Sequence, residues 1–251
     1  MIIGIPKEIK RGERRVTIDP YWTSQCVGGG HEVLIEKDAG LFSGFEDKAY
    51  QQAGGQILDR RTTLWSRADL IAKFKEIQKE EYPLMHEGQI ITCFFHLAED
   101  VNPEICDALR SSKVTTFSLE QLVTRGGLRV AVAPMSEMAG WIAAIQMAKL
   151  LFEPPDSMGV ALANFSGAGA PRITVLGGGI VGYFAAKTLL GMGADVTILE
   201  RDFPRMMELN RLFGGRVRML SSNDGNLRNS LQEVSVSRMH SWIVAFDRPK
   251  I

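Results

Sequence analysis

Short apolar runs alternate with helical segments along roughly the first 120 residues, a pattern typical of a parallel sheet with connecting helices. The runs predicted to be strands are Ile2–Ile5, Glu32–Glu36, Leu70–Lys75, Gln89–Phe95 and Val114–Ser118. The segments predicted to be helices are Tyr21–Val27, Asp47–Ala53, Thr62–Arg67 and Pro103–Ser111. We therefore expect this part of the chain to form one α/β domain.

A strongly helical stretch, Met135–Phe152, follows and is rich in alanine, methionine, isoleucine and leucine. One proline precedes it, and a pair of prolines stops it. Because the stretch is apolar nearly all round, we expect it to be buried between domains or subunits. The chain is thus divided into a first domain at 1–134, a connecting and interface helix at 135–152, and a second domain at 153–251.

The second domain repeats the alternation of strands and helices. Its predicted strands are Ile173–Leu176, Val196–Leu199 and Val217–Leu220, with the apolar run Trp242–Phe246 as a fourth. Its predicted helices are Val181–Leu190, Pro204–Phe213 and Asn226–Val234. The sequence therefore predicts an α/β protein with two Rossmann-like parallel-sheet domains joined by a long helix.

The composition is that of an ordinary globular protein and narrows the choice of partners. Hydrophobic residues make up 45% of the 251 residues, and 29 basic residues balance 29 acidic ones. This balance leaves no basic footprint for nucleic acid or an anionic membrane. Three widely spaced cysteines predict neither a metal site nor a disulfide framework. With no signal peptide and no apolar run long enough to span a bilayer, we expect a cytoplasmic protein.

A glycine motif, Gly177-Gly178-Gly179-Ile180-Val181-Gly182, lies between the first strand and first helix of the second domain. A lone GxGxxG is a weak signal, but this position is the one that the dinucleotide-binding fingerprint requires. Gly177 permits the tight turn, Gly179 lets the backbone approach a pyrophosphate, and Gly182 lets helix and strand pack closely. Ile180 and Val181 open the helix whose N–H groups face the phosphates. The alternative is a glycine turn in an α/β unit that binds no nucleotide.

An acidic residue, Glu200, closes the next predicted strand, where a carboxylate would bond the hydroxyls of the adenosine ribose. An acid at this position repels a 2′-phosphate, which favours NAD over NADP as the cofactor. The neighbouring Arg201 weakens that preference.

The chain resembles the alanine dehydrogenase family, which is related to the α subunit of proton-translocating transhydrogenase. The likeness runs almost continuously from Met1 to about Leu227. It rests on Ile3–Glu8, Gly12–Val16, His31–Glu36, Gly40–Gly44, Lys73–Glu76, Phe95–Ala98, Ala133–Gly140, Gly177–Gly182 and Leu212–Val217. His96 and the tetrapeptide at 134–137 favour the alanine dehydrogenase branch over transhydrogenase and saccharopine-type relatives. The resemblance implies reversible, NAD-dependent oxidative deamination of L-alanine to pyruvate and ammonia.

Three residues carry the chemistry that the resemblance implies. His96 follows an apolar strand and is assigned the acid/base role, which suits the titration range of histidine. Lys75 ends another strand and binds and polarises the substrate, and Arg15 grips its carboxylate, for which a guanidinium is well shaped. Without the resemblance, each would be read as an ordinary structural or solvated residue.

Further contacts are implied at the start of the long helix and in the second domain. Met135 and Ser136 would approach the substrate and the nicotinamide, although Met135 could equally be core packing. Ser222 follows the third strand of the second domain and would lie near the adenosine end of the cofactor. The alternative for Ser222 is a helix cap.

The resemblance fades after about Leu227, and family members run on well past residue 251. We therefore expect a C-terminally shortened chain with an incomplete NAD-binding domain. By the resemblance, the missing part would contain a catalytic aspartate and an asparagine near the nicotinamide, and Asp247 matches neither position. The leading hypothesis is an oligomeric alanine dehydrogenase-like enzyme that assembles through helix 135–152. A second is a catalytically weak relative that binds nucleotide or a carboxylic acid as a regulatory or assembly protein. A third is a scaffold that serves another imine or carbonyl reduction, or a chemistry that uses no hydride at all.

Overall fold

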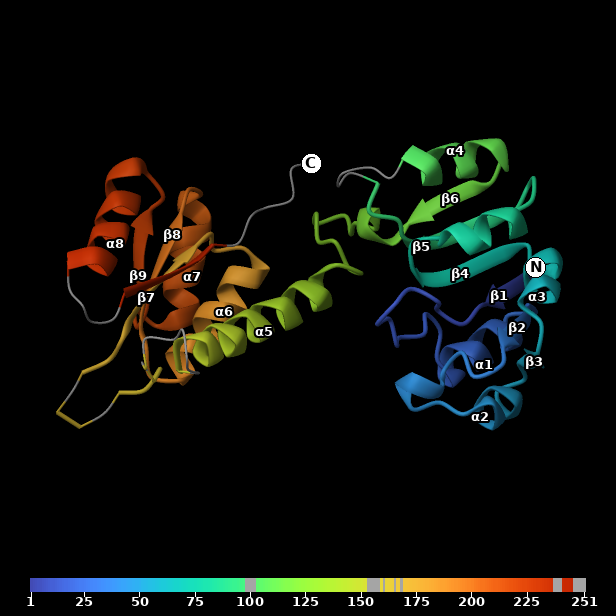
Figure 1. Cartoon of the computed structure of the whole chain (residues 1–251), viewed down its shortest axis with the longest axis horizontal. Coiled ribbons are helices and arrows are strands. Elements are labelled where there is room, and N and C mark those ends of the chain that lie inside the picture. The colour runs from blue at the N-terminus through green and yellow to red at the C-terminus, as the bar shows by residue number, and fades with distance from the viewer. Residues whose placement is uncertain are drawn as a thin grey trace. The chain divides into compact units, whose positions relative to one another are not determined.

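Two parallel sheets organise the chain, each in its own unit (Figure 1). The computed structural model describes residues 1–97, 103–152, 159, 161–164, 166–167, 169–236 and 241–245. One unit is Met1–Ala131, and the other begins at Val132. The predicted α/β class with two parallel sheets is confirmed.

The sheet of the first unit has the strand order β3-β2-β1-β4-β5-β6, and every pairing is parallel. Its strands are β1 (Ile2–Ile5), β2 (Glu32–Glu36), β3 (Gln56–Leu58), β4 (Leu70–Lys75), β5 (Ile90–Phe94) and β6 (Thr115–Ser118). The strand order reverses beside β1, and in such sheets ligands bind outside the carboxyl ends of the strands near that point. This edge of the sheet is therefore where functional residues are expected.

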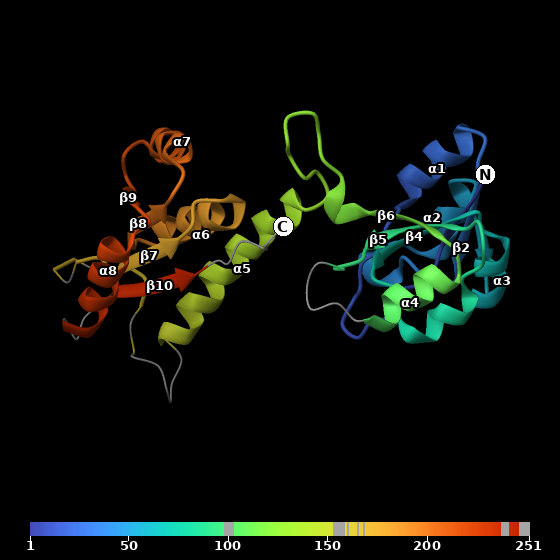
Figure 2. The ribbon, with the colours of Figure 1, turned by 90° about the horizontal axis from the view of Figure 1, so that it is seen from above.

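Helices cover both faces of this sheet (Figure 2). They are α1 (Pro20–Gly28), α2 (Asp47–Gln52), α3 (Arg61–Arg67) and α4 (Pro103–Ser111), with short 3₁₀ turns η1 (Leu41–Ser43), η2 (Lys79–Leu84) and η3 (Leu119–Gln121). Strand alternation divides the core into two clusters: Val33 and Ile35 pack toward α1 and α2, while Leu34 packs toward α3 and α4. Burial on both faces explains why the strands read as continuous apolar runs.

The second unit holds a four-stranded parallel sheet in the order β10-β7-β8-β9. Its strands are β7 (Arg172–Leu176), β8 (Asp195–Glu200), β9 (Arg218–Ser221) and β10 (Ser241–Ala245). Its helices are α5 (Ala133–Phe152), α6 (Ile180–Gly191), α7 (Phe203–Phe213) and α8 (Asp224–Val236). The predicted strand at Trp242–Phe246 is present as β10, while Phe246 and Asp247 lie outside the described residues.

The long helix α5 packs against α6 within the second unit. A Cβ on Gly140 would lie 2.5 Å from the carbonyl oxygen of Val181, so the missing side chain lets the two backbones approach closely. Ala144 and Leu151 are buried on the same side. The opposite side keeps an apolar strip at least 45% exposed in the single chain: Met138, Trp141, Ile142, Ile145 and Phe152. Within the second unit, one side of α5 is thus covered and the other is exposed.

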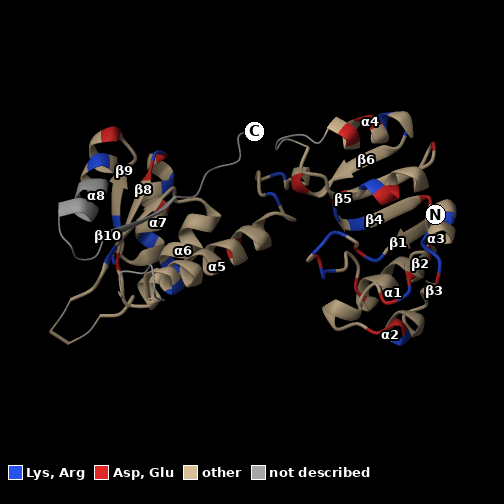
Figure 3. Cartoon of the chain, in the orientation of Figure 1, with Lys and Arg blue, Asp and Glu red and all other residues tan. Residues whose placement is uncertain are grey.

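Basic and acidic residues are interspersed along the described parts of both units, as Figure 3 shows. Among the described residues, no helix combines the length and apolar character needed to cross a membrane.

Candidate active site

Lys75 and His96 meet at the carboxyl edge of the first sheet. Lys75 ends β4 and His96 follows β5, and these two strands are neighbours. Lys75 Nζ lies 3.1 Å from His96 Nε2. A lysine ammonium only donates, so the acceptor of a hydrogen bond between these two atoms is Nε2. The strand pairing therefore places a cation and a proton acceptor in direct contact.

His96 stands on an unusual piece of backbone. Its φ of 54° lies in the left-handed region, which costs a non-glycine residue about 1–3 kcal/mol. The N–H of His96 donates to Glu120 Oε1 at 2.6 Å, and its ring stacks on Phe94 with centroids 6.2 Å apart. Burial opposes ionisation of Glu120, but hydrogen bonds from Ser118 and from the backbone of His96 outweigh it and lower the pKa of this carboxyl. Outliers of this kind cluster at functional sites.

Arg15 reaches the same edge of the sheet from the loop after β1. Its guanidinium lies 3.8 Å from the ring centroid of Phe74, the residue before Lys75. Glu13 holds it in a two-pronged ion pair, with Nε to Oε1 at 2.8 Å and Nη2 to Oε2 at 2.6 Å. Burial opposes ionisation of Glu13, but hydrogen bonds from Arg15 and Arg14 outweigh it and lower its pKa to about 2. Arg15 is thereby oriented toward β4 by a carboxylate that stays ionised.

A buried charge cluster lies beneath this edge, and sequence reasoning missed it. Lys73 has a fully buried side chain whose Nζ lies 2.8 Å from Glu81 Oε1 and 3.2 Å from Glu8 Oε2. Glu8 Oε1 also accepts from the N–H groups of Phe74 and Lys75, at 2.6 and 3.2 Å. Burial raises the pKa of Glu8, against the opposing charge of Lys73. The register of β4 against β5 shifts between Ala72 and Lys75, so simple alternation does not describe this strand end.

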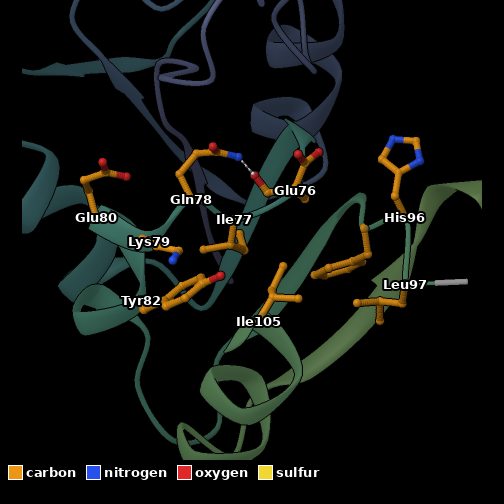
Figure 4. Close-up of a pocket in the computed structure, with 10 residues that line it drawn as sticks. Glu76, Ile77, Gln78, Lys79, Glu80, Tyr82, His96, Leu97 and Ile105 are labelled. Atoms are coloured by element: carbon orange, nitrogen blue, oxygen red, sulfur yellow. Dashed lines mark hydrogen bonds between the residues drawn. The ribbon is translucent and has the colours of Figure 1, made fainter. Parts of the chain in front are cut away.

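A cavity of about 420 Å³ lies beside His96, lined by residues of η2, α4 and the end of β5 (Figure 4). Ile77, Tyr82, Phe95 and Ile105 supply much of its wall. In Figure 4 the imidazole of His96 is directed away from Ile77 and Ile105. A second hollow of about 270 Å³ is lined by Arg15, Trp22 and Phe74 among others. The second hollow contains Arg15 and adjoins Lys75 along the chain, so it is the better candidate for a substrate carboxylate.

The glycine motif of the second unit has the geometry that a phosphate loop needs. Gly177 has φ 91°, and a Cβ on Gly182 would lie 1.9 Å from the Gly177 carbonyl oxygen, so both positions require glycine. Gly179 is the N-cap of α6 and makes no side-chain cap, and a Cβ there would meet no described atom within 4 Å. Ile180 and Val181 form the first turn of α6. Open space in front of this helix start fits a pyrophosphate.

Glu200 braces the same loop. Its carboxylate is nearly buried and accepts from the N–H of Gly178 at 2.6 Å and from Arg201 and Asp202 at 2.7 and 3.1 Å. Arg205, which the sequence did not single out, donates from Nε to the Gly178 carbonyl at 2.8 Å. Contact between Glu200 and a ribose stays a prediction.

Three other residues from the sequence prediction occupy the second unit. Met135 and Ser136 lie half-buried in the first turns of α5. Ser222 is exposed after β9, and its N–H donates to the Glu200 carbonyl. The side chain of Asn223, not Ser222, caps α8 by accepting from the N–H of Asn226 at 2.8 Å. The helix-cap alternative for Ser222 is therefore wrong, and its cofactor role stays a prediction.

Comparison with known proteins assigns the chain to a family. Residues 4–139 match the N-terminal domain of the alanine dehydrogenase/PNT family, and residues 143–237 match its C-terminal domain. The chain belongs to this family. An alanine dehydrogenase of Bacillus subtilis (strain 168) is 39% identical over 236 residues, which are 94% of this chain and 61% of the relative. An alanine dehydrogenase of Methanococcus maripaludis is 38% identical over 94% of this chain and 63% of its own length.

Solved structures of the family share the fold. An L-alanine dehydrogenase matches with a TM-score of 0.84 and 35% identity, over 91% of this chain and 63% of that protein. A transhydrogenase from Sinorhizobium meliloti matches with a TM-score of 0.73 at 23% identity, which supports the fold alone. The chain thus spans about three fifths of the length of the relatives that it matches.

Proposed function

We propose that this alanine dehydrogenase/PNT family member is an NAD-dependent dehydrogenase that oxidises a small L-amino acid to a 2-oxo acid and ammonia. L-Alanine is the first candidate substrate, and pyruvate is then the product. The observation that carries the proposal is the 3.1 Å contact between Lys75 Nζ and His96 Nε2 at the carboxyl edge of the sheet. The printed names of the relatives support the choice of substrate.

The side chains at this edge suit the steps that such an oxidation needs. The guanidinium of Arg15 binds the substrate carboxylate, with Phe74 behind it. Lys75 donates to a carboxylate or carbonyl oxygen of the substrate, which releases His96 Nε2 to accept a proton from the amine. After His96 has released that proton to solvent, its Nε2 accepts a proton from the water that adds to the imine carbon. Bound NAD would supply the acceptor for the hydride that leaves the α-carbon.

The phosphate loop fits a dinucleotide without further side chains. The open space at Gly179, the uncapped start of α6 and the close approach that Gly182 allows are the features that hold a pyrophosphate. Glu200 supplies the acid at the end of β8 that favours NAD over NADP. Ser136 and Ser222 are further candidates for cofactor contacts, and Met135 is a candidate for contact with the substrate.

Direct turnover tests the proposal. Purified protein is mixed with NAD and L-alanine, and separately with NADH, pyruvate and ammonia, while absorbance of the reduced cofactor is followed. We expect turnover in both directions and its loss in His96→Ala and Lys75→Ala. Measurable NAD binding without turnover would reject the enzyme and favour the regulatory binding protein. Activity unchanged in His96→Ala would reject the assigned mechanism.

We also propose a homo-oligomer that assembles through α5. The support is the exposed apolar strip that includes Trp141, Ile142 and Ile145, since contiguous apolar surface exposed to water marks association sites. Light scattering after gel filtration should give a mass above that of one chain, and the double variant Ile142→Asp/Ile145→Asp should reduce it. A monomeric wild-type protein would contradict this assignment.

We further propose a reducing cytoplasmic location. Cys26, Cys93 and Cys106 are all free thiols in the structure, and Cys93 is buried. Thiol counting on unfolded protein taken from cells should find all three reduced. A disulfide between any two would contradict the proposal.

A further inference from the structure

The two proposed catalytic residues are held by the same backbone device at neighbouring strand ends. In the sheet order β1-β4-β5-β6, Lys75 and His96 stand at the ends of the two inner strands. A carboxylate from each flanking strand reaches inward to them. Glu8 comes from the chain just after β1, and Glu120 comes from η3, just after β6. Each accepts the N–H groups of two consecutive residues where the ladder of sheet hydrogen bonds ends.

Glu120 accepts hydrogen bonds from the backbone just after β5. Its Oε2 accepts from the N–H of Phe95 at 3.2 Å, and its Oε1 accepts from the N–H of His96 at 2.6 Å. The second bond is short, as expected where the acceptor is ionised. It is made at the one residue of this strand end that has a positive φ. The carboxylate therefore compensates for a backbone conformation that His96 would otherwise leave.

Glu8 accepts hydrogen bonds from the backbone at the end of β4 in the same way. Its Oε1 accepts from the N–H groups of Phe74 and Lys75, and its Oε2 faces the buried ammonium of Lys73. The side chain of Glu8 is 4% exposed, so little water is available to replace these bonds. The backbone at Lys75 is thus held by an acceptor just after β1 in addition to its pairing with Phe94 of β5, whose register with β4 is irregular there.

We propose that Glu8 and Glu120 are positioning residues, which fix the backbone from which Lys75 and His96 project and so keep their side-chain nitrogens in contact. The proposal rests on the proposed function for its effect on catalysis. Its structural content, the Lys75–His96 contact, can be measured whether or not the protein turns over. A carboxylate suits this role because it accepts two N–H groups at once, whereas a carboxamide has one acceptor oxygen and a competing NH₂ donor.

Glu120 gives the sharper test, because it is only partly buried and has no ion pair among the described residues to be orphaned. Glu120→Ala should lower kcat about 100-fold, the size of effect expected from a misplacement of about 1 Å. Glu120→Gln keeps one acceptor and should lower it less, by about tenfold. The dissociation constant of NAD should stay within about twofold of the wild type, since the phosphate loop belongs to the other unit. Glu87→Gln, which changes an exposed glutamate on the same unit, is the matched control and should leave kcat unchanged.

A spectroscopic signature separates positioning from general destabilisation. In the wild type, the amide proton of His96 should resonate far downfield, and a nuclear Overhauser effect should link the Lys75 side chain to the imidazole. Both should be lost in Glu120→Ala while the remaining spectrum stays folded. Glu8→Gln should weaken the same Overhauser effect through Lys75, provided that its spectrum shows a folded protein.

The outcomes distinguish this proposal from the proposed function. If the wild type turns over and Glu120→Ala keeps kcat within twofold, or keeps the Lys75–His96 Overhauser effect, the positioning role is wrong. If Glu120→Ala had a lower melting temperature but an unchanged kcat at low temperature, the role of Glu120 would be merely structural. If the wild type does not turn over but the Overhauser effect disappears in Glu120→Ala, the proposed function fails and the positioning stands.

Discussion

Removing the buried ammonium of Lys73 should destabilise the first unit strongly. Its Nζ lies between the carboxylates of Glu81 and Glu8. The side chains of Lys73 and Glu81 are 0% exposed, and that of Glu8 is 4% exposed. Lys73→Met keeps much of the side-chain volume but removes the buried cation beside Glu8 and leaves Glu81 with only the more distant Arg61, at 3.9 Å. Breaking a buried ion pair from one side costs about 3–5 kcal/mol. With a urea dependence of about 2 kcal/mol per M, the unfolding midpoint should fall by about 2 M.

The loss should depend on pH in a direction fixed by Glu8. Burial already raises the pKa of this carboxyl above its ordinary 4.5, and Lys73 opposes that rise. In the variant the opposition is gone, so the folded-state pKa rises further. A carboxyl whose pKa is raised by folding favours the folded state below its unfolded pKa, and this benefit is lost as pH rises through the folded value. The variant should therefore be weakest at neutral pH and recover as pH falls toward about 4.5.

Urea unfolding of wild type and variant between pH 4.5 and 7.5 measures both effects. Lys37→Met is the control, because Lys37 pairs with Asp59 at 3.4 Å but the two side chains are 58% and 80% exposed. An exposed pair contributes about 0–1 kcal/mol, so this variant should unfold near the wild-type midpoint. A loss in Lys73→Met below about 1 kcal/mol, or one that does not change with pH, would refute the buried-cluster reasoning.

Three further perturbations test other parts of the structure. The pKa of Glu13 falls from 4.5 to about 2 on folding, so the stability it contributes is present above pH 4.5 and is lost as pH falls through about 2. In Glu13→Gln the urea midpoint of unfolding should therefore change less with pH over this range than in the wild type. Gly179→Ala should leave the melting temperature unchanged, because a Cβ at this position meets no described atom within 4 Å. It should nevertheless weaken NAD binding, measured by calorimetry, at least about tenfold. Gly191→Ala, where a Cβ is equally unobstructed, is the control and should bind NAD as the wild type does. Tyr50→Phe removes a buried 3.0 Å hydrogen bond to the Ile18 carbonyl and should cost about 1–3 kcal/mol; a midpoint equal to wild type would show that this carbonyl finds water instead.

Periodicity was enough to predict most of the secondary structure, because both sheets are buried on two faces and their strands form apolar runs. The exceptions are short. Strand β3 has three residues at a sheet edge, Gln56–Leu58, too few for a pattern to emerge. The 3₁₀ turn η2, Lys79–Leu84, is polar and contains a proline, and its start depends on a capping box between Gln78 and Glu81. Such local hydrogen-bond geometry is hard to read from hydropathy.

Some residues of the candidate site could likewise be predicted from the sequence, and others could not. Gly177 and Gly182 could be predicted because the spacing of the motif reflects backbone constraints seen in the structure. Gly177 has a positive φ, and a Cβ on Gly182 would collide with the Gly177 carbonyl oxygen. His96 and Lys75 could be named from the family resemblance, but their contact depends on β4 and β5 being neighbours, which is a property of the strand order. Glu8 and Glu120 are ordinary charged residues in sequence. Their partners are backbone N–H groups 66 and 24 residues away, and no spacing rule points to them.

These long-range contacts also explain why the site needs the whole sheet and not just its two central strands. A lysine and a histidine at free strand ends would each sample several conformations, and their nitrogens would seldom meet. The segments that follow the flanking strands β1 and β6 supply the carboxylates that restrict β4 and β5, and the buried Lys73 balances one of those charges. Stability of the charged cluster and geometry of the site are therefore coupled through Glu8. Lys73→Met should accordingly lower kcat at pH 7 even in the molecules that remain folded, and Lys37→Met should not.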